Sequence, residues 1–433
     1  MSRYVLRGGV VVGPTEARRA DVLVDEGRII SVGTDLDVGR AEELDCTGAW
    51  VGPAYVDLHS HLREPGAEAA ETIHSGARAG VRGGYGALVA MPNTEPALDS
   101  VSLVRDVLER GRSSALDVAV CAAITVGRRG ERLAPLGDLA DLGVRLFSDD
   151  GTGVANPLVM RRALEYARPL GVRLAQHCED ASLCAGGVMN EGEWSRRLGL
   201  GGRPAIAEEI MVARDLDLLR LTGGRLHLLH LSTARAVGLA LAARAEGLDV
   251  TFEVTPHHLV LDESACAAYD PIMKVHPPLR AASDVAALGE LLRQGRLDAV
   301  ATDHAPHAPE TKDQPFDEAP AGMLGLEHAA SVVHEVLGAN RPLDLFRVLS
   351  RTPASIAGLD RPGPLGLSVH GGDVVAGEDA NLVVFDPSVT WSVDREHLQS
   401  RATNTPYHGR TLTGRARHTL VRGVPRVREG EMQ

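Results

Sequence analysis

The sequence lacks any apolar run approaching the roughly 18 to 20 residues that are needed to cross a bilayer. It also lacks the apolar segment of a secretory signal, since Arg3 and Arg7 lie within its first residues, which read as a strand. Hydrophobic residues nevertheless make up 44% of the 433, which allows a sizeable core and excludes a disordered chain. We therefore expect a globular protein of the cytoplasm that makes no membrane contact.

Cysteine is scarce and scattered. The five cysteines are odd in number and lack CxxC spacing, so neither a disulfide framework nor a zinc ribbon is indicated. We interpret them as thiols of the core: Cys46, Cys121, Cys178, Cys184 and Cys266. A formal net charge of -13, without a basic stripe that carries interleaved aromatic residues, weighs against nucleic acid as a partner. This composition favours a small-molecule substrate.

Lysine is almost absent. Lys274 and Lys312 are the only two among the 45 basic residues of the chain. Any mechanism that requires a lysine must therefore use one of these two.

From residue 56 onward, short apolar segments alternate with longer segments of helical periodicity, as in repeated strand-helix units. Segments such as 157–171, 208–224 and 234–249 have apolar residues at three- and four-residue spacing and glycine near their ends. The eight predicted strands lie at 56–61, 86–94, 117–125, 144–150, 172–178, 225–232, 248–258 and 297–307. Eight such units predict an α/β fold, a (β/α)8 TIM-like barrel.

Both flanks of this region read as short strands joined by Gly and Asp turns. We expect the two ends of the chain to meet in one small β-sandwich beside the barrel. The predicted division is therefore 1–53 for the first part of the sandwich, 54–363 for the catalytic barrel and 364–433 for the second part of the sandwich.

Metal-binding types of side chain follow five of the predicted strands, at the face where a barrel of this kind carries its reactive groups. His59 and His61 project to the same side of the first strand, because side chains alternate along a strand. The other strands contribute Asp149 or Asp150, His177, His230, and Asp303 with His304 and His307. Each alone could be a polar turn or a hydrogen-bonded neighbour, but together they predict a metal centre.

Imidazole and carboxylate groups without thiolate suit zinc, or manganese, iron or cobalt in similar geometry. Four histidines and two aspartates exceed one tetrahedral zinc shell, so the prediction is one or two ions per chain. Such ions lower the pKa of bound water toward neutrality, and hydrolysis is the implied reaction class.

Several motifs occur in order through nearly the whole chain: "DLHSHLREPG", "MPNTEP", "FSDDG", "QHCED", "HLST", "EVTPHHL", "HPPLR", "ATDHAPH", "GMLGLE" and "NTPY". Together they resemble a type I dihydroorotase of the amidohydrolase superfamily. The pair "HLREPG" and "ATDHAPH" is the specific part, whereas the HxH alone marks only the superfamily. The resemblance implies reversible, metal-dependent hydrolysis of L-dihydroorotate to N-carbamoyl-L-aspartate in pyrimidine biosynthesis.

The resemblance also implies roles for the metal-binding residues. His59 and His61 would bind the more buried ion with Asp303, which would also shuttle the proton, while His177 and His230 would bind the second ion. Related cyclic amidases bridge their two ions with a carboxylated lysine at the end of the fourth strand. No lysine lies between His61 and His230 here, and the residue that matches the family's aspartate at this place is Asp150. Asp149 is the alternative bridge, although a turn position suits it better.

Substrate contacts follow from the same resemblance. Arg63 would hold the substrate carboxylate with its planar fork of donors, and the further contacts are His61, Asn93, His276, His307 and the backbone of Ala321 and Gly322. His276 departs from the asparagine that is usual in the family, and the size and titration of a histidine would alter that contact. Some of these residues also have structural alternatives to a role in the site. Arg63 could form an ion pair with Glu64 or Glu71, and Asn93 could stabilise a turn. We interpret His257 and His258 as structural residues.

Two other functions remain open. One is a hydantoinase-like or allantoinase-like cyclic amidase, against which the missing lysine and Arg63 argue. The other is an inactive dihydroorotase-like subunit that supports aspartate carbamoyltransferase, against which the complete set of ligand candidates argues. The resemblance also suggests a homodimer and names aspartate carbamoyltransferase as a candidate partner.

Overall fold

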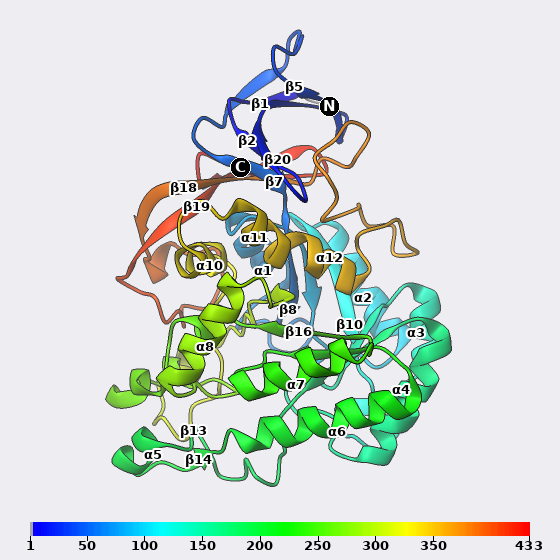
Figure 1. Ribbon diagram of the computed structural model, residues 1–433, viewed down its shortest axis with the longest axis vertical. Helices are drawn as coiled ribbons and strands as arrows, with labels where there is room; N and C mark the ends of the chain where they lie inside the picture. Colours follow the sequence, from blue (N-terminus) through cyan, green and yellow to red (C-terminus); the bar gives the residue numbers. More distant parts are fainter. Residues whose placement is uncertain (1–2) are drawn as a thin grey trace.

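Eight parallel strands form a barrel at the centre of the computed structural model, which describes residues 3–433 (Figure 1). They are β8 (Tyr55–Ser60), β9 (Tyr85–Ala90), β10 (Asp117–Ala122), β11 (Leu146–Ser148), β12 (Arg173–His177), β15 (Leu226–Leu229), β16 (Val250–Val254) and β17 (Ala299–Val300). Each pairs with the next, and the barrel closes where the His61 amide donates to the carbonyl of His304 at 2.9 Å. The predicted α/β barrel is confirmed.

Helices surround this barrel. The longer ones are α1 (Ile73–Arg82), α2 (Val101–Arg112), α3 (Leu136–Leu142), α4 (Pro157–Leu170), α6 (Ile206–Thr222), α7 (Ala234–Ala245), α8 (Ala282–Arg293) and α10 (Ala329–Leu337), followed by α11 (Pro342–Phe346) and α12 (Thr352–Ala357). In α4 the Asn156 side chain accepts from the first free amides and Gly171 ends the helix in a left-handed conformation. Such start and stop signals explain why the predicted helices lie where the periodicity placed them.

Two loops carry small elements of their own. The loop after β12 contains β13 (Met189–Asn190), α5 (Glu193–Leu198) and β14 (Gly202–Arg203), and the loop after β17 contains α9 (Pro309–Lys312). Both loops follow strand ends at the carboxyl face of the barrel, where they can reach a bound molecule.

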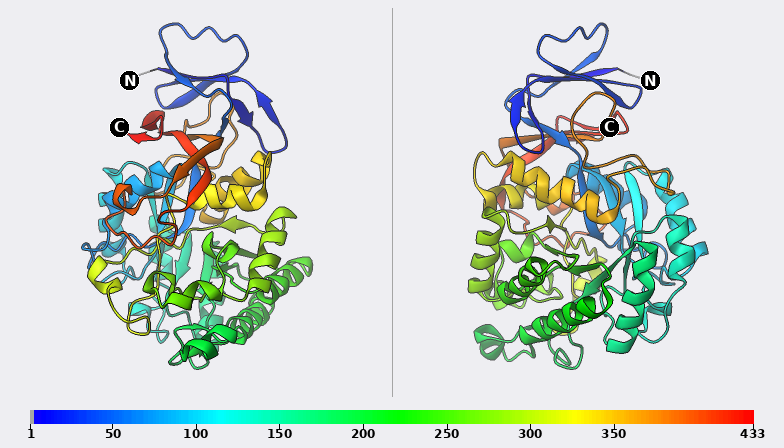
Figure 2. Two further views of the ribbon diagram at one scale, coloured as in Figure 1. Left: turned by 90° about the vertical axis from the view of Figure 1, so that its left-hand side faces the viewer. Right: turned by 45° about the vertical axis from the view of Figure 1, so that its right-hand side comes forward.

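The two ends of the chain meet at one end of the molecule (Figure 2). A four-stranded sheet contains β1 (Tyr4–Arg7), β4 (Asp21–Asp25), β5 (Arg28–Gly33) and β6 (Glu42–Asp45). A seven-stranded sheet contains β2 (Val10–Val12), β3 (Ala17–Arg19), β7 (Trp50–Pro53), β18 (Leu382–Ser392), β19 (Thr411–Val421), β20 (Val424–Arg428) and β21 (Glu431–Met432). Buried side chains of both sheets, such as Leu6, Val22 and Leu420, share one core. The sequence predicted this sandwich; its exact boundaries stay a prediction.

The sandwich packs directly against the barrel. Trp50 of β7 stacks on Phe385 of β18, and both belong to the same core as Tyr55 and Phe346 of the barrel. Gly52 allows this approach, because a Cβ atom there would lie 2.3 Å from the Phe346 ring. Among residues 3–433, no helix is both long enough and apolar enough to span a membrane. All five cysteines are buried and free.

Candidate active site

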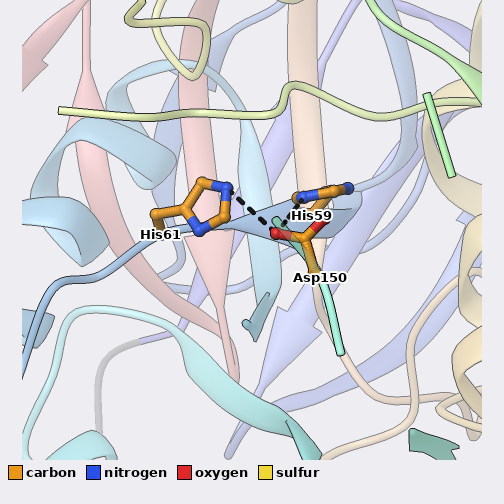
Figure 3. A group of neighbouring side chains, drawn as sticks. All are labelled: His59, His61 and Asp150. Atoms are coloured by element: carbon orange, nitrogen blue, oxygen red, sulfur yellow. Dashed lines mark ion pairs between the residues drawn. The ribbon is translucent and has the colours of Figure 1, made fainter. Parts of the chain in front are cut away.

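Six predicted ligand side chains converge at the carboxyl ends of the barrel strands. His59 lies in β8 and His61 follows it, and these rings flank the carboxylate of Asp150, which follows β11 (Figure 3). The Asp150 Oδ2 atom lies 3.4 Å from His59 Nε2 and 3.6 Å from His61 Nε2. Its Oδ1 atom lies 3.4 Å from His177 Nδ1 and 3.5 Å from His230 Nε2. Each carboxylate oxygen of Asp150 therefore faces one pair of histidines.

Asp303 completes this cluster from the other side. It follows β17, and its Oδ1 atom lies 3.0 Å from His61 Nε2 and 3.5 Å from His59 Nε2. Burial opposes ionisation of Asp303, but His59 and His61 hold its pKa well below the usual value for a carboxyl group. Asp303 is therefore an ionised carboxylate beside the first histidine pair.

The donor atoms fit metal ions. Within residues 3–433, His59 Nε2 and Asp150 Oδ1 are buried and have no hydrogen-bond partner, which is costly for polar atoms unless something else binds them. Two groups of three ligand atoms lie within 4.8 Å of one another, His59 with His61 and Asp150, and Asp150 with His177 and His230. Asp150 belongs to both groups, which is the arrangement of a carboxylate that bridges two ions.

The remaining ring nitrogens are hydrogen-bonded to acceptors that fix the tautomers. His59 donates from Nδ1 to Glu253 at 2.9 Å, and His61 donates from Nδ1 to the Asn93 side-chain oxygen at 2.8 Å. His177 donates from Nε2 to Glu179 at 3.2 Å. The other ring nitrogen of each of these histidines faces Asp150, which makes it the atom that could bind a metal ion.

Glu253 and Glu179 also belong to the site, although the strand pattern did not predict them. Glu253 is fully buried in β16, and its second oxygen accepts from His227 at 3.0 Å. The sequence does contain a sign of both residues. Glu253 is the only charged residue of the strand "VTFEV", and Glu179 directly follows "QHC". The strand pattern does not say which histidine such a residue contacts.

Asp149 points away from the cluster. Its carboxylate accepts the backbone amides of Ile124 and Thr125, both at 2.9 Å, and the hydroxyl of Thr125. These bonds join the end of β11 to the end of β10. The structure thus places Asp150, and not Asp149, among the histidines.

A cavity of about 220 Å³ opens above these residues. It is lined by His61, Arg63, Asn93, Asp150, Gly151, His177, His230, His276, Asp303, Ala305, His307, Ala321 and Gly322. The structure therefore brings every predicted substrate contact into the same cavity as the ligand cluster.

Arg63 is directed into this cavity rather than into a surface ion pair. Its Nε donates to the carbonyl of Pro306 at 3.1 Å. Glu64 instead pairs with Arg110, and Glu71 with His304, so neither glutamate forms an ion pair with Arg63 within the described chain. The outer nitrogens of the guanidinium group remain available to a carboxylate.

Two histidines of the cavity are neutral. Burial lowers the pKa of His276 to about 3, and the same cause, with Arg63 nearby, lowers the pKa of His307 to about 3. His307 donates from Nε2 to the carbonyl of Ala321 at 2.8 Å. His276 Nε2 is buried and has no partner within residues 3–433, so a bound molecule can satisfy it.

His257 and His258 lie behind the site. A ring nitrogen of His258 lies 2.8 Å from the Thr255 hydroxyl and the other lies 3.2 Å from the carbonyl of Pro277, while His257 packs on its ring at 4.6 Å. These contacts agree with the structural role that the sequence predicted for them.

Comparison with known proteins gives the family. Residues 48–236 match the family model described as dihydro-orotase-like. The chain is 46% identical to a dihydroorotase of Mycobacterium tuberculosis over 96% of this chain and 97% of that protein. It is also 44% identical to a dihydroorotase of Streptomyces coelicolor over 100% of both chains, and 43% identical to one of Pelotomaculum thermopropionicum over 97% of both. The chain belongs to the dihydroorotase family.

Solved structures with the same fold include other cyclic amidases. A dihydropyrimidinase of Brevibacillus agri has a TM-score of 0.86 at 24% identity and covers 99% of this chain and 96% of that chain. An L-hydantoinase of Arthrobacter aurescens has the same TM-score and identity over 100% and 98%. At this identity the likeness shows a shared barrel and sandwich. The family membership of this dihydroorotase-like chain rests on its full-length relatives.

Proposed function

We propose that this chain is a type I dihydroorotase, which converts L-dihydroorotate and water reversibly into N-carbamoyl-L-aspartate in the synthesis of pyrimidines. The observation that carries the proposal is the Asp150 carboxylate between two pairs of histidines, in one cavity with Arg63. The full-length similarity to dihydroorotases supports the same reaction.

In this proposal His59, His61 and Asp303 would hold one zinc ion, His177 and His230 would hold a second, and Asp150 would be a ligand in both sets. A buried carboxylate needs such neighbours, since burial alone would raise the pKa of Asp150 whereas the histidines hold it well below its usual value. When bound, the ions polarise the amide carbonyl and acidify water.

Asp303 is the proton carrier of the proposed reaction. Hydrolysis adds water to the ring amide carbonyl and breaks its bond to the ring nitrogen. The ionised Asp303 carboxylate accepts the proton of the attacking water and then donates it to the departing nitrogen. In the synthetic direction the same proton moves back, so that one carboxylate serves both directions.

The cavity wall orients the substrate. The outer nitrogens of Arg63 form a fork that suits the carboxylate of dihydroorotate. Asn93 uses its oxygen on His61, which leaves its amide nitrogen as a donor toward the cavity. His276 Nε2, His307 and the backbone of Ala321 and Gly322 are the proposed contacts to the ring.

A single assay tests this function. Purified protein is incubated with dihydroorotate, N-carbamoyl-L-aspartate, hydantoin and allantoin, and the metal content per chain is measured on the same sample. We expect turnover of the first two compounds only, with one or two zinc ions per chain. Turnover of hydantoin or allantoin without dihydroorotate would establish another cyclic amidase. A metal-free protein that turns over none of them would establish an inactive subunit.

We also propose that the protein is a homodimer and works in the cytoplasm, where its five free thiols would stay reduced. Aspartate carbamoyltransferase is the proposed partner. Light scattering of the purified chain, with and without added aspartate carbamoyltransferase, measures both assemblies.

A further inference from the structure

The only two lysines of the chain lie together beside the substrate cavity. Lys274 is 6% exposed and Lys312 is 8% exposed, whereas most of the 45 basic residues of the chain are arginines. Burial, with Lys274 nearby, lowers the pKa of Lys312 to about 7, and Lys312 in turn helps to lower the pKa of His307. Burying an ammonium group is costly unless its hydrogen bonds compensate.

Both ammonium groups bind backbone carbonyls instead of carboxylates. Lys312 donates to the carbonyls of Pro271 at 2.9 Å and Pro320 at 2.8 Å, and Lys274 donates to the carbonyl of Asp317 at 2.9 Å. Within residues 3–433, neither lysine forms an ion pair with a carboxylate. A compact ammonium group with three donors suits carbonyls that converge from several directions, whereas a planar guanidinium group does not.

These bonds join two walls of the cavity. One wall is the loop after β17, which contributes His307, Ala321 and Gly322, and the other is the segment 271–276, which contributes His276. The Gly322 amide also donates to the Lys274 carbonyl at 2.8 Å. Lys312 holds the residue directly before Ala321, so its ammonium group acts on the backbone that faces the substrate.

We propose that Lys274 and Lys312, the lysine pair, are positioning residues that hold these two walls together for substrate binding. This inference rests on the proposed dihydroorotase function. Without one of the lysines, the backbone carbonyls that it binds lose their hydrogen-bond donor and must be hydrated instead. The loop after β17 then separates from the segment 271–276. Five of the six metal-ligand side chains lie on other elements, and Asp303 lies at the start of the loop after β17, nine residues before Lys312. We therefore expect the ligand cluster to keep its geometry and the loss to fall on substrate binding rather than on the chemical step.

The lysine pair can be tested with endoproteinase Lys-C, because the wild-type chain offers it only these two cleavage sites. The variants are Lys312→Met, which leaves Lys274 as the single site, and Lys274→Met, which leaves Lys312. We expect each to be cleaved at its remaining lysine about tenfold faster than wild type, and saturating N-carbamoyl-L-aspartate to restore protection. We also expect KM for dihydroorotate to rise about tenfold with kcat within about threefold.

Three controls test whether the protease cleaves an exposed lysine, whether charge alone is sufficient, and whether the variants are folded. Arg40→Lys places a lysine in an exposed turn of the sandwich, where it should be cleaved rapidly with unchanged turnover. Lys312→Arg keeps the charge and should give a KM between those of wild type and Lys312→Met. Thermal unfolding shows whether each variant is folded. If a variant does not fold, wild type is cleaved in urea below its unfolding transition, where N-carbamoyl-L-aspartate must slow cleavage at Lys312.

The inference is overturned if the folded Met variants keep the KM and cleavage rates of wild type, if kcat falls while KM is unchanged, or if the ligand does not slow wild-type cleavage at Lys312. Cleavage of the unliganded variants does not depend on turnover. A wild-type protein that is inactive on dihydroorotate would therefore contradict the proposed function, while the cleavage rates would still decide whether the lysine pair holds the walls together.

Discussion

At the scale of single residues, neighbouring aspartates have different surroundings. Asp150 faces four histidines, whereas Asp149 binds the backbone of Ile124 and Thr125. We predict that Asp150→Asn loses bound metal and that its kcat falls at least about a hundredfold. Asp149→Asn, the matched control, should keep its metal but lose about 1 to 3 kcal/mol of stability, because buried amides lose a charged acceptor. Metal analysis and urea unfolding of both variants measure this, and equal metal content would contradict the assignment of Asp150.

The Glu253 carboxylate orients His59 without facing the cavity. It accepts from His59 and His227 while fully buried, and despite that burial these histidines lower its pKa to about 2. We predict that Glu253→Gln weakens metal binding by about 10- to 100-fold, because His59 loses its charged partner. Dialysis against a graded chelator series measures the loss. Glu165→Gln on the exposed side of α4 is the control and should retain metal as wild type does.

Arg63 is expected to contribute to substrate binding rather than to the chemical step. Its side chain lines the cavity without an ion pair to Glu64 or Glu71 in the described chain. We predict that Arg63→Met raises KM for dihydroorotate by about 30- to 100-fold, the value of a charge-assisted hydrogen-bonded pair, and that Arg63→Lys restores part of it. Steady-state kinetics measure both. An unchanged KM in Arg63→Met would remove Arg63 from carboxylate binding.

The side chains that the structure gathers in the cluster could be predicted from the sequence because each follows a recognisable strand. The alternation of side chains places His59 and His61 on one side, and the barrel order brings Asp150 and Asp303 to them. The hydrogen bond from His59 to Glu253 could not be predicted in this way, since it joins residues 194 positions apart. Such contacts depend on the closed barrel and leave no local pattern.

At the scale of elements, all eight predicted strands are present, and all except β8, Tyr55–Ser60, are shorter than the predicted segments. The segment 297–307 contains only β17, Ala299–Val300, because the polar residues after it leave the sheet to form the site. The helix predicted over 157–171 is α4, Pro157–Leu170, almost unchanged, because Asn156 and Gly171 mark its ends. Helix ends have side-chain signals, whereas the end of a parallel strand is set by its neighbours.

The start of α7 gives a prediction about an element. Thr233 caps this helix by accepting from the Ala236 amide, and its own hydroxyl donates to Glu208. We predict that Thr233→Ala costs about 1 to 2 kcal/mol of stability. Ser100 stands at the same place before α2 but forms no side-chain cap bond, so Ser100→Ala is the control and should cost less than about 0.5 kcal/mol. Urea unfolding measures both, and equal losses would contradict the capping role.

At the scale of the whole molecule, the sandwich and the barrel share buried surface. We retain the division 1–53, 54–363 and 364–433 as a proposal. It is supported by the strand boundaries, because β7 of the sandwich ends at Pro53 and β8 of the barrel begins at Tyr55. The core that joins Trp50 and Phe385 to Phe346 crosses this division. The composition of the two flanks predicted that they would meet, but not which surface of the barrel they would cover, because that depends on long-range packing.

Glu327 lies where the barrel meets the C-terminal segment. Its side chain is 5% exposed, accepts from the Gln399 amide at 2.7 Å and lies 3.6 Å from Arg82. Burial raises its pKa from 4.5 to about 7, although the Gln399 amide, Arg82 and Arg415 oppose the shift. The folded protein therefore holds this proton more tightly than the unfolded chain does. The resulting stability is fully present below pH 4.5 and is lost as the pH rises through about 7.

Glu327→Gln cannot ionise, so we predict that it unfolds at a higher temperature than wild type at pH 8.5 and at the same temperature as wild type at pH 4.5. At about 1.4 kcal/mol for each pH unit between 4.5 and 7, the gain is at most about 3.5 kcal/mol. Melting curves at half-unit intervals of pH measure it. Glu431→Gln is the control, since Glu431 contacts the same Arg82 but is 71% exposed, and it should show no such trend. A Glu327→Gln gain that is independent of pH would show that packing, and not ionisation of the buried carboxyl group, limits stability where the barrel meets the C-terminal segment.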